Sequence, residues 1–312
     1  MVKGWVEKQA FKIGLKNPTI FRQVVRRAAY SRAEGDPEKV HELALEAMNE
    51  HLDVIEEASK DFDFEDLHVN IAGFDVIPFG TAAGLDKNGD VLRPLSRLFG
   101  YQKTGTIVVP IRKGNKRPRV VVDEKLNEIY NAQGFPSKGL DYALEKIQKF
   151  REDNKYSILI PSVCGLPLEE NLDNAYEELE VLLTKLKPYS NGIEWNPFSP
   201  NTKALAALRT PTEFKRSAQL IKSIFEDKLK VVKMGPYEEE KSSWQQCCTV
   251  RRAYNFSSSG YFWIDNCKEI YGICRHAGSR GSRNHKHSSN QPEAVIVQLG
   301  RRIWPGFFTI RI

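Results

Sequence analysis

From Ile77 onward, short apolar segments alternate with longer amphipathic ones, and this alternation restricts the chain to very few folds. The segments typical of strands are residues 78–83, 104–109, 157–163, 192–196 and 230–234. Those typical of helices are residues 90–99, 138–152, 170–186 and 212–227. Strands that alternate with helices form parallel sheets, because each crossover must be long enough to hold a helix. Single strands at this regular spacing predict an α/β protein with a (β/α)8 barrel, the TIM barrel, in which the residues after each strand gather at one rim.

The segment that ends the first predicted strand, Phe79 to Gly89, suits the close approach of a flat ligand. It is rich in small residues such as Ala83 and Gly84, so that a ligand could reach the backbone. Lys87 follows at once and places one cation beside this backbone cradle. By composition alone, the segment could equally be a strand-to-helix turn with a solvated lysine.

The run Ala82-Ala83-Gly84-Leu85-Asp86-Lys87-Asn88 resembles the end of the first barrel strand in the dihydroorotate dehydrogenases, the flavin enzymes of pyrimidine synthesis. The resemblance continues, in the family's order, through Thr104-Gly105-Thr106, Gly114-Asn115-Lys116-Arg117-Pro118-Arg119, Asn131-Ala132-Gln133-Gly134-Phe135, Asn196-Pro197-Phe198-Ser199-Pro200-Asn201-Thr202 and Lys233. Each motif lies at the end of a predicted strand or in the loop that follows it. This placement agrees with a site at the rim of a barrel. The agreement is independent of the resemblance, because matching motifs could have fallen elsewhere along the chain.

The resemblance implies the oxidation of dihydroorotate to orotate in the de novo synthesis of UMP, with FMN as the cofactor. It assigns the base that removes the substrate's proton to Ser199. A serine is a poor base in water, so it would need a buried environment, an ordered water or a helpful neighbour. The structural alternative is a hydroxyl that caps the turn before Pro200.

The resemblance also implies which residues hold the two ligands. Those expected to face the substrate are Lys87, Asn131, Gly134, Phe135, Asn201 and Thr202. Those expected to face FMN are Ala83, Gly84, Lys87, Thr106, Ser162, Asn196, Lys233 and Gly300. A fixed ammonium stabilises the negative charge that reduction places on the flavin ring. Ser162 stands where the family commonly has an asparagine, so its reach is shorter.

Residues 1–62 predict a helical extension before the barrel of residues 63–312. Residues 1–32 have the pattern of one or two basic amphipathic helices, which either pack on the body or lie on an anionic membrane. Asp36-Pro37-Glu38 predicts the start of a further helix, with an N-cap aspartate and proline at the first position. We expect His41, within this helix, to be a packed or capping residue with no chemical role.

The Asp-Pro-Glu-x-x-His pattern resembles the entry segment of the class 2, quinone-dependent members, whose helices form the mouth that accepts a quinone. A serine at the position of the base agrees with class 2, since the soluble class 1 enzymes usually carry cysteine there. The resemblance therefore implies a cytoplasmic protein, peripheral on the cytoplasmic membrane, that passes electrons to a membrane quinone. No run of apolar residues reaches the length of a spanning helix.

Two segments outside the barrel pattern have short strand signals. Residues 67–77 alternate as a hairpin that would seal one end of the barrel. The insert of residues 108–131 combines short apolar pieces with six Lys and Arg, most of which we expect to be solvated. The resemblance implies that this insert forms a small sheet over the barrel mouth and presents Asn131 to the substrate.

Charge and cysteine are concentrated in the last quarter of the chain. Residues 241–312 hold 11 Lys and Arg against 3 Asp and Glu, so the net charge of +6 belongs to this tail and does not indicate a nucleic-acid partner. Cys247, Cys248, Cys267 and Cys274 lie in the same tail. Their spacing contains no Cys-x-x-Cys pair, which argues against a zinc site, and we expect no metal.

Residues 241–292 match neither a helical nor a strand period, and the family pattern returns only at Ala294 to Gly300, which resembles the last barrel strand. We interpret the stretch as a reading-frame error in the gene or its sequencing. Reading Lys241 to Cys248 from the third base of each codon, with AGY serines, permits Lys-Gln-Leu-Ala-Ala-Val-Leu-Tyr, an amphipathic helix. An intact frame in the DNA, with peptide masses that match the printed residues, would refute this interpretation.

Two alternatives to a quinone-dependent dihydroorotate dehydrogenase stay open. A related soluble FMN oxidoreductase with another acceptor would reduce quinone no better when lipid or detergent is present. A defective barrel that has lost strands and catalysis would purify without colour. The oligomeric state does not follow from the sequence.

Overall fold

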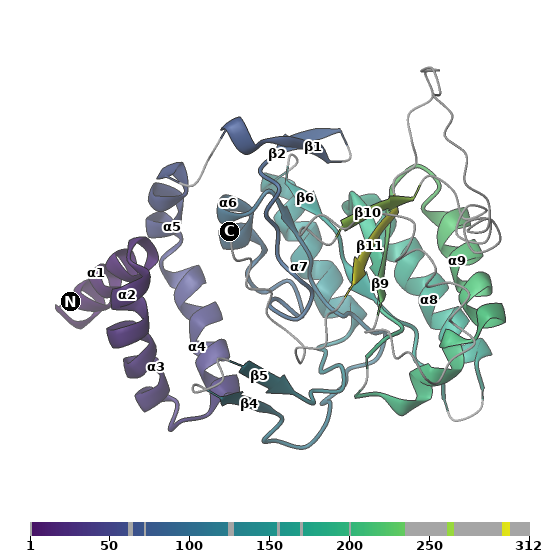
Figure 1. Ribbon diagram of the computed structural model, residues 1–312, viewed down its shortest axis with the longest axis horizontal. Coiled ribbons are helices and arrows are strands. Elements are labelled where there is room, and N and C mark those ends of the chain that lie inside the picture. Colours follow the sequence, from purple (N-terminus) through teal and green to yellow (C-terminus); the bar gives the residue numbers. More distant parts are fainter. Residues whose placement is uncertain are drawn as a thin grey trace, which may run out of the picture. The chain divides into compact units, whose positions relative to one another are not determined.

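The computed structural model describes residues 2–61, 65–71, 73–123, 128–154, 157–168, 171–199, 201–234, 261–264 and 295–299 (Figure 1). Helices and short strands alternate along most of this part of the chain. The chain divides into two compact units, of which the first extends to Ser162 and the second begins at Val163.

The first unit opens with helices, as predicted. They are α1 (Val2–Lys16), α2 (Pro18–Ile20), the π-helical turn η1 (Phe21–Val25), α3 (Arg26–Arg32), α4 (Pro37–Glu50) and α5 (Leu52–Ala58). Helix α4 begins where the sequence predicts, because the Asp36 carboxylate accepts hydrogen bonds from the backbone N–H groups of Glu38 (2.8 Å) and Lys39 (3.4 Å). Asn17 caps α2 in the same way.

Helices α1 and α5 lie side by side, and three ion pairs join α1 to α5 and to the 3-10 turn that follows it, which ends at Asp61. Lys8 pairs with Asp53, Lys12 with Glu57 (2.8 Å) and Lys16 with Asp61 (2.6 Å). The partners recur every four residues on both segments, which places them on one face of each. The polar face of α1 is thus matched to α5, while Ile13, Ile20, Phe21 and Val24 remain exposed.

The remainder of the first unit contains two antiparallel strand pairs and one parallel pair. The elements are the 3-10 turns η2 (Ser59–Asp61) and η3 (Glu65–Leu67), β1 (Val69–Ile71), β2 (Phe74–Val76), α6 (Leu92–Leu98), β3 (Tyr101–Gln102), β4 (Val120–Asp123), β5 (Glu128–Asn131), α7 (Leu140–Asp153), β6 (Ile158–Leu159) and β7 (Ser162–Val163), which ends at the boundary. Strands β1 and β2 form the predicted hairpin, and β4 and β5 form the predicted small sheet. Strand β3 pairs with β6 in parallel.

Three predicted strands are shorter than expected, and residues 157–163 form two short strands, β6 and β7, in different sheets. Residues 78–83 and 104–109 form isolated bridges instead of a ladder, including the parallel bridges of Gly80 with Tyr101 and of Asp86 with Thr104. For residues 104–109 the physical reason lies in Gly105 (φ +119°), whose left-handed backbone interrupts a pleated ladder. The parallel direction of the bridges still agrees with the predicted strand-helix alternation.

The second unit contains α8 (Asp173–Leu186), η4 (Lys187–Tyr189), β8 (Gly192–Trp195), the 3-10 segment η5 (Lys203–Arg209), α9 (Pro211–Ile224), β9 (Leu229–Met234), β10 (Tyr261–Ile264) and β11 (Val295–Leu299). The five-stranded sheet has the order β10-β11-β9-β8-β7. Strand β9 is parallel to both β8 and β11, whereas β10 runs antiparallel to β11. Strand β10 lies inside residues 241–292, so the absence of strand structure expected there is wrong for these four residues. The rest of that stretch lies outside the described residues.

The helices bury the faces that their periodicity predicts. Helix α8 buries Leu179, Leu182, Leu183 and Leu186, and α7 buries Leu140, Ala143, Ile147 and Phe150. Trp195 of β8 is fully buried, with its ring 5.1 Å from that of Phe214 in α9. In the described part of the chain, no helix combines the length and hydrophobicity that crossing a bilayer requires.

Candidate functional site

The loop after Phe79 is held in place by one buried carboxylate. Asp86 is inaccessible to solvent, and its side chain accepts hydrogen bonds from four backbone N–H groups: those of Asn88 (3.3 Å), Gly89 (2.8 Å), Asp90 (2.9 Å) and Val91 (3.1 Å). Burial raises the pKa of Asp86, against these donors, which favour the charged form. The turn they form fixes the backbone on either side of Lys87.

Lys87 is a partly buried cation at the centre of this loop. Burial lowers the pKa of Lys87, and the nearby charge of Glu38 opposes that shift. Among the described residues, none forms an ion pair or hydrogen bond with its ammonium group. A desolvated cation without a partner is costly in a folded protein, so its position suits a site that receives a negatively charged group.

The next motif is tied directly to this loop. The carbonyl oxygen of Asp86 accepts hydrogen bonds from the Thr104 hydroxyl (2.9 Å) and the Gly105 backbone (2.8 Å). The Thr106 hydroxyl lies 3.3 Å from the Ser162 hydroxyl, and the backbone of Ile107 donates to the Ser162 carbonyl at 2.7 Å. Three segments that are far apart in sequence therefore bring the predicted residues Lys87, Thr106 and Ser162 into one region of the first unit.

A fourth segment joins this region from the insert of residues 108–131. Asn131 ends β5, opposite Val120 in β4, and the chain then makes a tight turn at Gly134 (φ +67°) and Phe135 (φ +56°). A left-handed backbone is unusual for phenylalanine and marks a position that the surrounding structure holds in a strained conformation. The Asn88 side chain accepts a hydrogen bond from the backbone of Lys138 at 2.9 Å, which joins this segment to the Lys87 loop.

A buried ion pair lies beneath the insert. Glu38 of α4 and Arg119, before β4, have side chains only 7% exposed and are joined by hydrogen bonds of 2.7 and 3.1 Å. Burial alone would raise the pKa of Glu38, but the hydrogen bonds and charge of Arg119 outweigh it and hold that pKa below its ordinary value. Lys113, Lys116 and Arg117 are exposed, which agrees with the expectation that most cations of the insert are solvated, whereas Arg119 is buried.

In the second unit, the loop after β8 carries Ser199. The Arg209 side chain fixes this loop by donating hydrogen bonds to the carbonyl oxygens of Pro197 (2.9 Å) and Ser199 (3.0 Å). Its guanidinium carbon lies 5.1 Å from the centre of the Phe198 ring. Ser199 is partly buried, and its backbone position is set by a residue ten positions later.

The other predicted residues of this unit lie near strand ends. Asn196 directly follows β8, is buried, and donates its backbone N–H to the Val163 carbonyl at 3.0 Å. The Thr202 hydroxyl is inaccessible to solvent and has no hydrogen-bond partner among the described residues, while the neighbouring Asn201 is partly buried. Lys233 is a partly buried residue of β9, next to Gln298 of β11 in the parallel register. Gly300 lies outside the described residues, as do the four cysteines of the tail.

Sequence reasoning missed several residues that shape the site. In the sequence, Glu38 was recognised only as part of a helix-start signal, and Arg119 only as one cation in a charged run. His41 is partly buried near Lys87, and burial lowers its pKa to about 4, so it is a neutral packed histidine as expected. Arg209 lies in a segment with no recognised motif. A signal for Arg209 was its position directly before the N-cap of a helix that follows the Ser199 loop.

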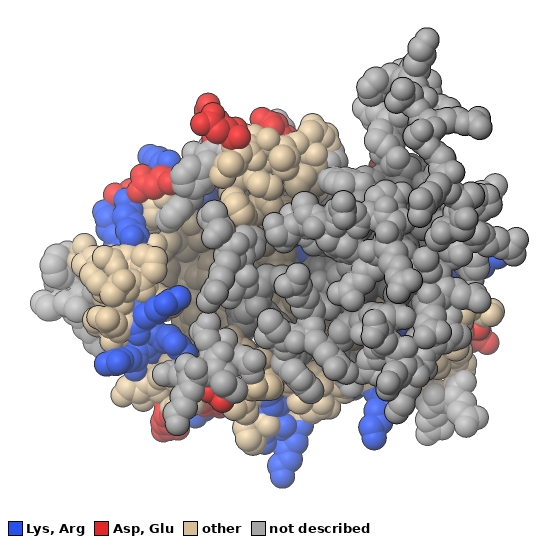
Figure 2. Space-filling model, in the orientation of Figure 1, with Lys and Arg blue, Asp and Glu red and all other residues tan. Residues whose placement is uncertain are grey.

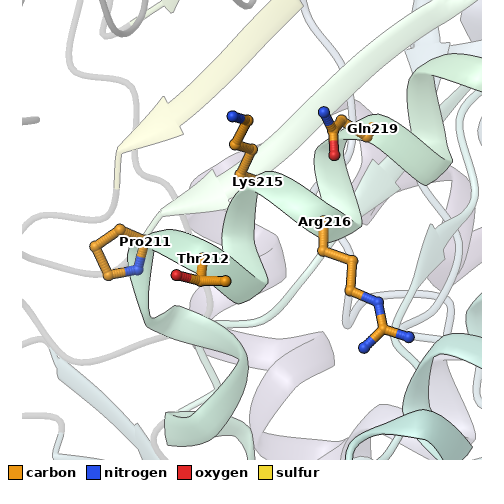
Figure 3. Close-up of a pocket in the computed structure, with 5 residues that line it drawn as sticks. All are labelled: Pro211, Thr212, Lys215, Arg216 and Gln219. Atoms are coloured by element: carbon orange, nitrogen blue, oxygen red, sulfur yellow. The ribbon is translucent and has the colours of Figure 1, made fainter.

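A shallow hollow elsewhere does not involve the predicted residues. It has a volume of about 430 Å³ and is lined by Pro211, Thr212, Lys215, Arg216 and Gln219, all from α9 (Figure 3). The Lys215 and Arg216 side chains point in different directions from the helix (Figure 3). No set of polar groups converges there, so we do not regard the hollow as the functional site.

Comparison with known proteins gives a consistent result. A sequence model of the family "Dihydroorotate dehydrogenase" matches residues 66–257, more than half of the chain. "Dihydroorotate dehydrogenase (quinone)" of Nitrosomonas eutropha is 34% identical over 147 residues, covering 47% of this chain and 42% of the relative. The protein of the same name from Baumannia cicadellinicola is 32% identical over 177 residues, covering 56% and 52%. The chain thus spans about half of the length of these relatives.

Solved structures agree at the level of the fold. The crystal structure of DHODH from Eimeria tenella in complex with ferulenol superposes with a TM-score of 0.55 at 22% identity, covering 68% of this chain and 62% of that one. The ligand-free form superposes with the same TM-score at 23% identity. At this level of identity the likeness concerns the fold alone.

Proposed function

This chain belongs to the dihydroorotate dehydrogenase family, and from that premise we propose that it oxidises dihydroorotate to orotate with FMN as cofactor and a membrane quinone as the final acceptor. The observation that carries the proposal is the Lys87 loop. A partly buried ammonium without a partner among the described residues stands in a rigid turn, beside a backbone that a flat ring can approach.

The residues present fit a flavin. Gly84 has a left-handed backbone, and no atom lies within 4 Å of the position that a β-carbon would occupy there. Ala83, Gly84 and Lys87 would hold the ring on one side, with Thr106 and Ser162 beside them. For the second unit, the family resemblance assigns Asn196, Lys233 and Gly300 to FMN as well. These types of residue suit FMN. Small residues allow close contact with the ring, amides and hydroxyls can form hydrogen bonds with it, and cations can stabilise the reduced ring.

The proposed chemistry divides between the cofactor and the protein. FMN supplies the hydride acceptor. Ser199 accepts the proton from the neighbouring ring carbon while its own hydroxyl proton passes to an adjacent water, so that the charge on the serine does not change. The amides of Asn131 and Asn201 and the hydroxyl of Thr202 orient the substrate ring, against Gly134 and Phe135.

Lys87 and Lys233 stabilise the negative charge that develops during this step. Both side chains are partly buried, and Coulomb interactions are stronger there than in bulk water. The orphaned hydroxyl of Thr202 favours a substrate contact, because a buried hydroxyl without a partner is unfavourable until a ligand satisfies it.

We propose a closed (β/α)8 barrel for residues 63–312, preceded by the helical extension of residues 1–62. The parallel pairings β3–β6, β8–β9 and β9–β11, each between segments separated by a helix or a long connection, support this architecture. The antiparallel strand β10 is a departure from it.

The extension is the proposed route to the membrane and its quinone. Ile13, Phe21 and Val24 are 47%, 47% and 58% exposed, and exposed arginines lie on the same helices. Figure 2 shows Lys and Arg side chains gathered over the helices at the left of the view, where Figure 1 places α2 and α3. An amphipathic surface with cations suits the interface of an anionic bilayer.

The first test is the visible spectrum of the purified protein, followed by dihydroorotate without oxygen. We expect flavin absorption that bleaches when dihydroorotate is added and returns when a soluble quinone follows. Flavin absorption that does not bleach after dihydroorotate is added would contradict the proposal that dihydroorotate is the substrate. A colourless protein that takes up no added FMN would contradict the cofactor and favour a non-catalytic barrel.

A further inference from the structure

Glu38 is the least exposed carboxylate of the N-terminal helices that the structure describes, and it contacts two arginines of the insert. It accepts hydrogen bonds from Arg119 and lies 3.2 Å from the Arg117 guanidinium, and its charge partly offsets the lowering of the Lys87 pKa by burial. Gln133 also points its amide toward Glu38, at 3.4 Å. A buried ion pair adds little net stability compared with apolar packing, so stability alone does not account for this arrangement.

Arg119 transmits the position of Glu38 to the insert. While its Nε and one terminal nitrogen contact Glu38, the other terminal nitrogen donates to the carbonyl oxygens of Lys113 (2.6 Å) and Asn115 (2.9 Å). One planar guanidinium therefore fixes a helix and a loop at the same time. The rigid fork of arginine suits this task better than a flexible lysine would.

The fixed loop in turn holds residues 132–134, which follow Asn131. Ala132 donates its backbone N–H to the Arg119 carbonyl (2.7 Å), and its own carbonyl accepts from the Asn115 side chain (2.7 Å). The Gln133 carbonyl accepts from the Asn115 backbone (2.9 Å), and the Gly134 carbonyl accepts from the Arg112 side chain (2.8 Å). Every one of these contacts is made to residues 112–119, whose geometry depends on Arg119.

We propose that Glu38 is a positioning residue for the substrate: through Arg119 it sets the geometry of the segment that presents Asn131, Gly134 and Phe135. The N-terminal extension is then part of the substrate site as well as the proposed path of the electrons. This inference rests on the proposed function for its substrate, but its structural part stands on the contacts alone.

The test compares Glu38→Gln with Glu42→Gln in the full chain. Glu42 lies one helical turn further along α4 and pairs with Arg117 of the same insert at 2.6 Å, but its side chain is 51% exposed. The two variants remove the same charge from the same helix, one from the buried cluster and one from the surface. Glu38→Asp, which retains the charge, serves as the conservative variant.

The first readout is backbone hydrogen exchange, which needs neither flavin nor turnover. We expect Glu38→Gln to accelerate exchange at residues 113–115 and 132–134 by about tenfold, the equivalent of one charged hydrogen bond, and Glu42→Gln by less than about twofold. Glu38→Asp should fall between them. Unchanged exchange in Glu38→Gln, or equal acceleration in α7 and α8, would overturn the proposal.

The second readout separates binding from chemistry. In Glu38→Gln we expect KM for dihydroorotate to rise about tenfold with kcat within about threefold of the wild type, since a misplaced substrate segment weakens binding first. A local acceleration of exchange with unchanged KM would reduce Glu38 to a structural contact. If the wild type oxidises no dihydroorotate, the proposed function fails, while the exchange data still decide whether Glu38 holds the insert.

Discussion

At the scale of single residues, Ser199 lies in a loop that is fixed by contacts to its backbone, so its hydroxyl can be removed without dismantling the loop. Arg209 binds the carbonyl oxygens of Pro197 and Ser199 and does not depend on the serine side chain. We expect Ser199→Ala to bind FMN normally and to slow flavin reduction by dihydroorotate by about 10² to 10⁴, the usual contribution of a general base. Anaerobic stopped-flow absorbance measures this rate.

Ser223→Ala is a suitable control for this change. Ser223 is a serine of α9 whose hydroxyl donates only to the Leu220 carbonyl. Its replacement should leave the rate unaltered. A Ser199→Ala variant that is reduced as fast as the wild type would remove Ser199 from the mechanism and leave the turn-capping role.

His41 makes the stability of the protein depend on pH. Its pKa of about 4 in the folded state lies below the ordinary value of 6.5, because burial disfavours the charged imidazole. The unfolded chain therefore binds more protons between these values. The associated stability is fully present above about pH 6.5 and is lost as the pH falls toward 4.

Replacing His41 should remove this dependence. Between pH 7 and pH 5 the wild type should lose roughly 2 kcal/mol more unfolding free energy than His41→Phe, as measured by urea denaturation. Above pH 7 the difference between the two proteins should be constant. Parallel curves over the whole range would show that His41 is solvated in the folded protein.

At the scale of elements, the Thr104–Thr106 turn depends on a glycine. A β-carbon on Gly105 would lie 2.3 Å from the Ser162 carbonyl oxygen, and the backbone has φ +119°. We expect Gly105→Ala to destabilise the protein by about 2 to 4 kcal/mol, because both the backbone and a neighbouring segment must shift. Chemical denaturation measures the loss.

Gly35→Ala is the matched comparison for Gly105→Ala. Gly35 also has a left-handed backbone (φ +80°), but nothing lies within 4 Å of the β-carbon position. Its substitution should cost only about 1 kcal/mol, the backbone contribution alone. Equal losses in the two variants would mean that the contact with Ser162 does not constrain the turn.

The helices could be predicted from sequence, and the buried charges could not. The four helices predicted between residues 90 and 227 are confirmed, with ends set by local signals such as the Thr210 cap of α9. Those signals act within a few residues, so they can be read from the chain. Glu38 and Arg119 are 81 residues apart, and no local pattern distinguishes Arg119 from the solvated cations around it. The strand of residues 104–109 was overestimated because the left-handed backbone of Gly105 forms a turn and interrupts the ladder.

The same division applies to the candidate site. The sequence motifs predicted that Lys87, Thr106 and Ser162 belong together, and hydrogen bonds through Asp86, Thr104 and Gly105 connect the segments that carry them. The supporting residues were not predicted, because Asp86, Arg209 and Arg119 act on the backbone of other segments. Such contacts produce no characteristic residue spacing that could be recognised in the sequence.

At the scale of the whole molecule, the helical extension should govern association with lipid. We expect the double variant Phe21→Ser and Val24→Ser to bind vesicles that contain anionic lipid at least about tenfold more weakly than the wild type, because apolar burial supplies most of the interfacial binding energy. Vesicle sedimentation measures the bound fraction. Binding by the wild type should weaken in high salt and on neutral vesicles.

Val121→Ser provides the control for lipid binding. Val121 is 55% exposed, similar to Val24, but it belongs to the small sheet of the insert. Its replacement should not alter the bound fraction. Equal loss in the control would indicate nonspecific adhesion of exposed apolar side chains, and no binding by the wild type would remove the membrane from the proposal.

The three ion pairs between α1 and residues 53–61 also determine which insertions and deletions the extension can tolerate. Each lysine is 45 positions before its partner, so the two segments run in the same direction and keep one register over two turns. One residue gained between Lys8 and Lys16 would rotate part of α1 by about 100° and separate the pairs on one side of the insertion. The same residue gained in the turn before Asp36 would leave all three pairs in place. Natural length variation among relatives should therefore accumulate in the turns of the extension and avoid the interior of α1.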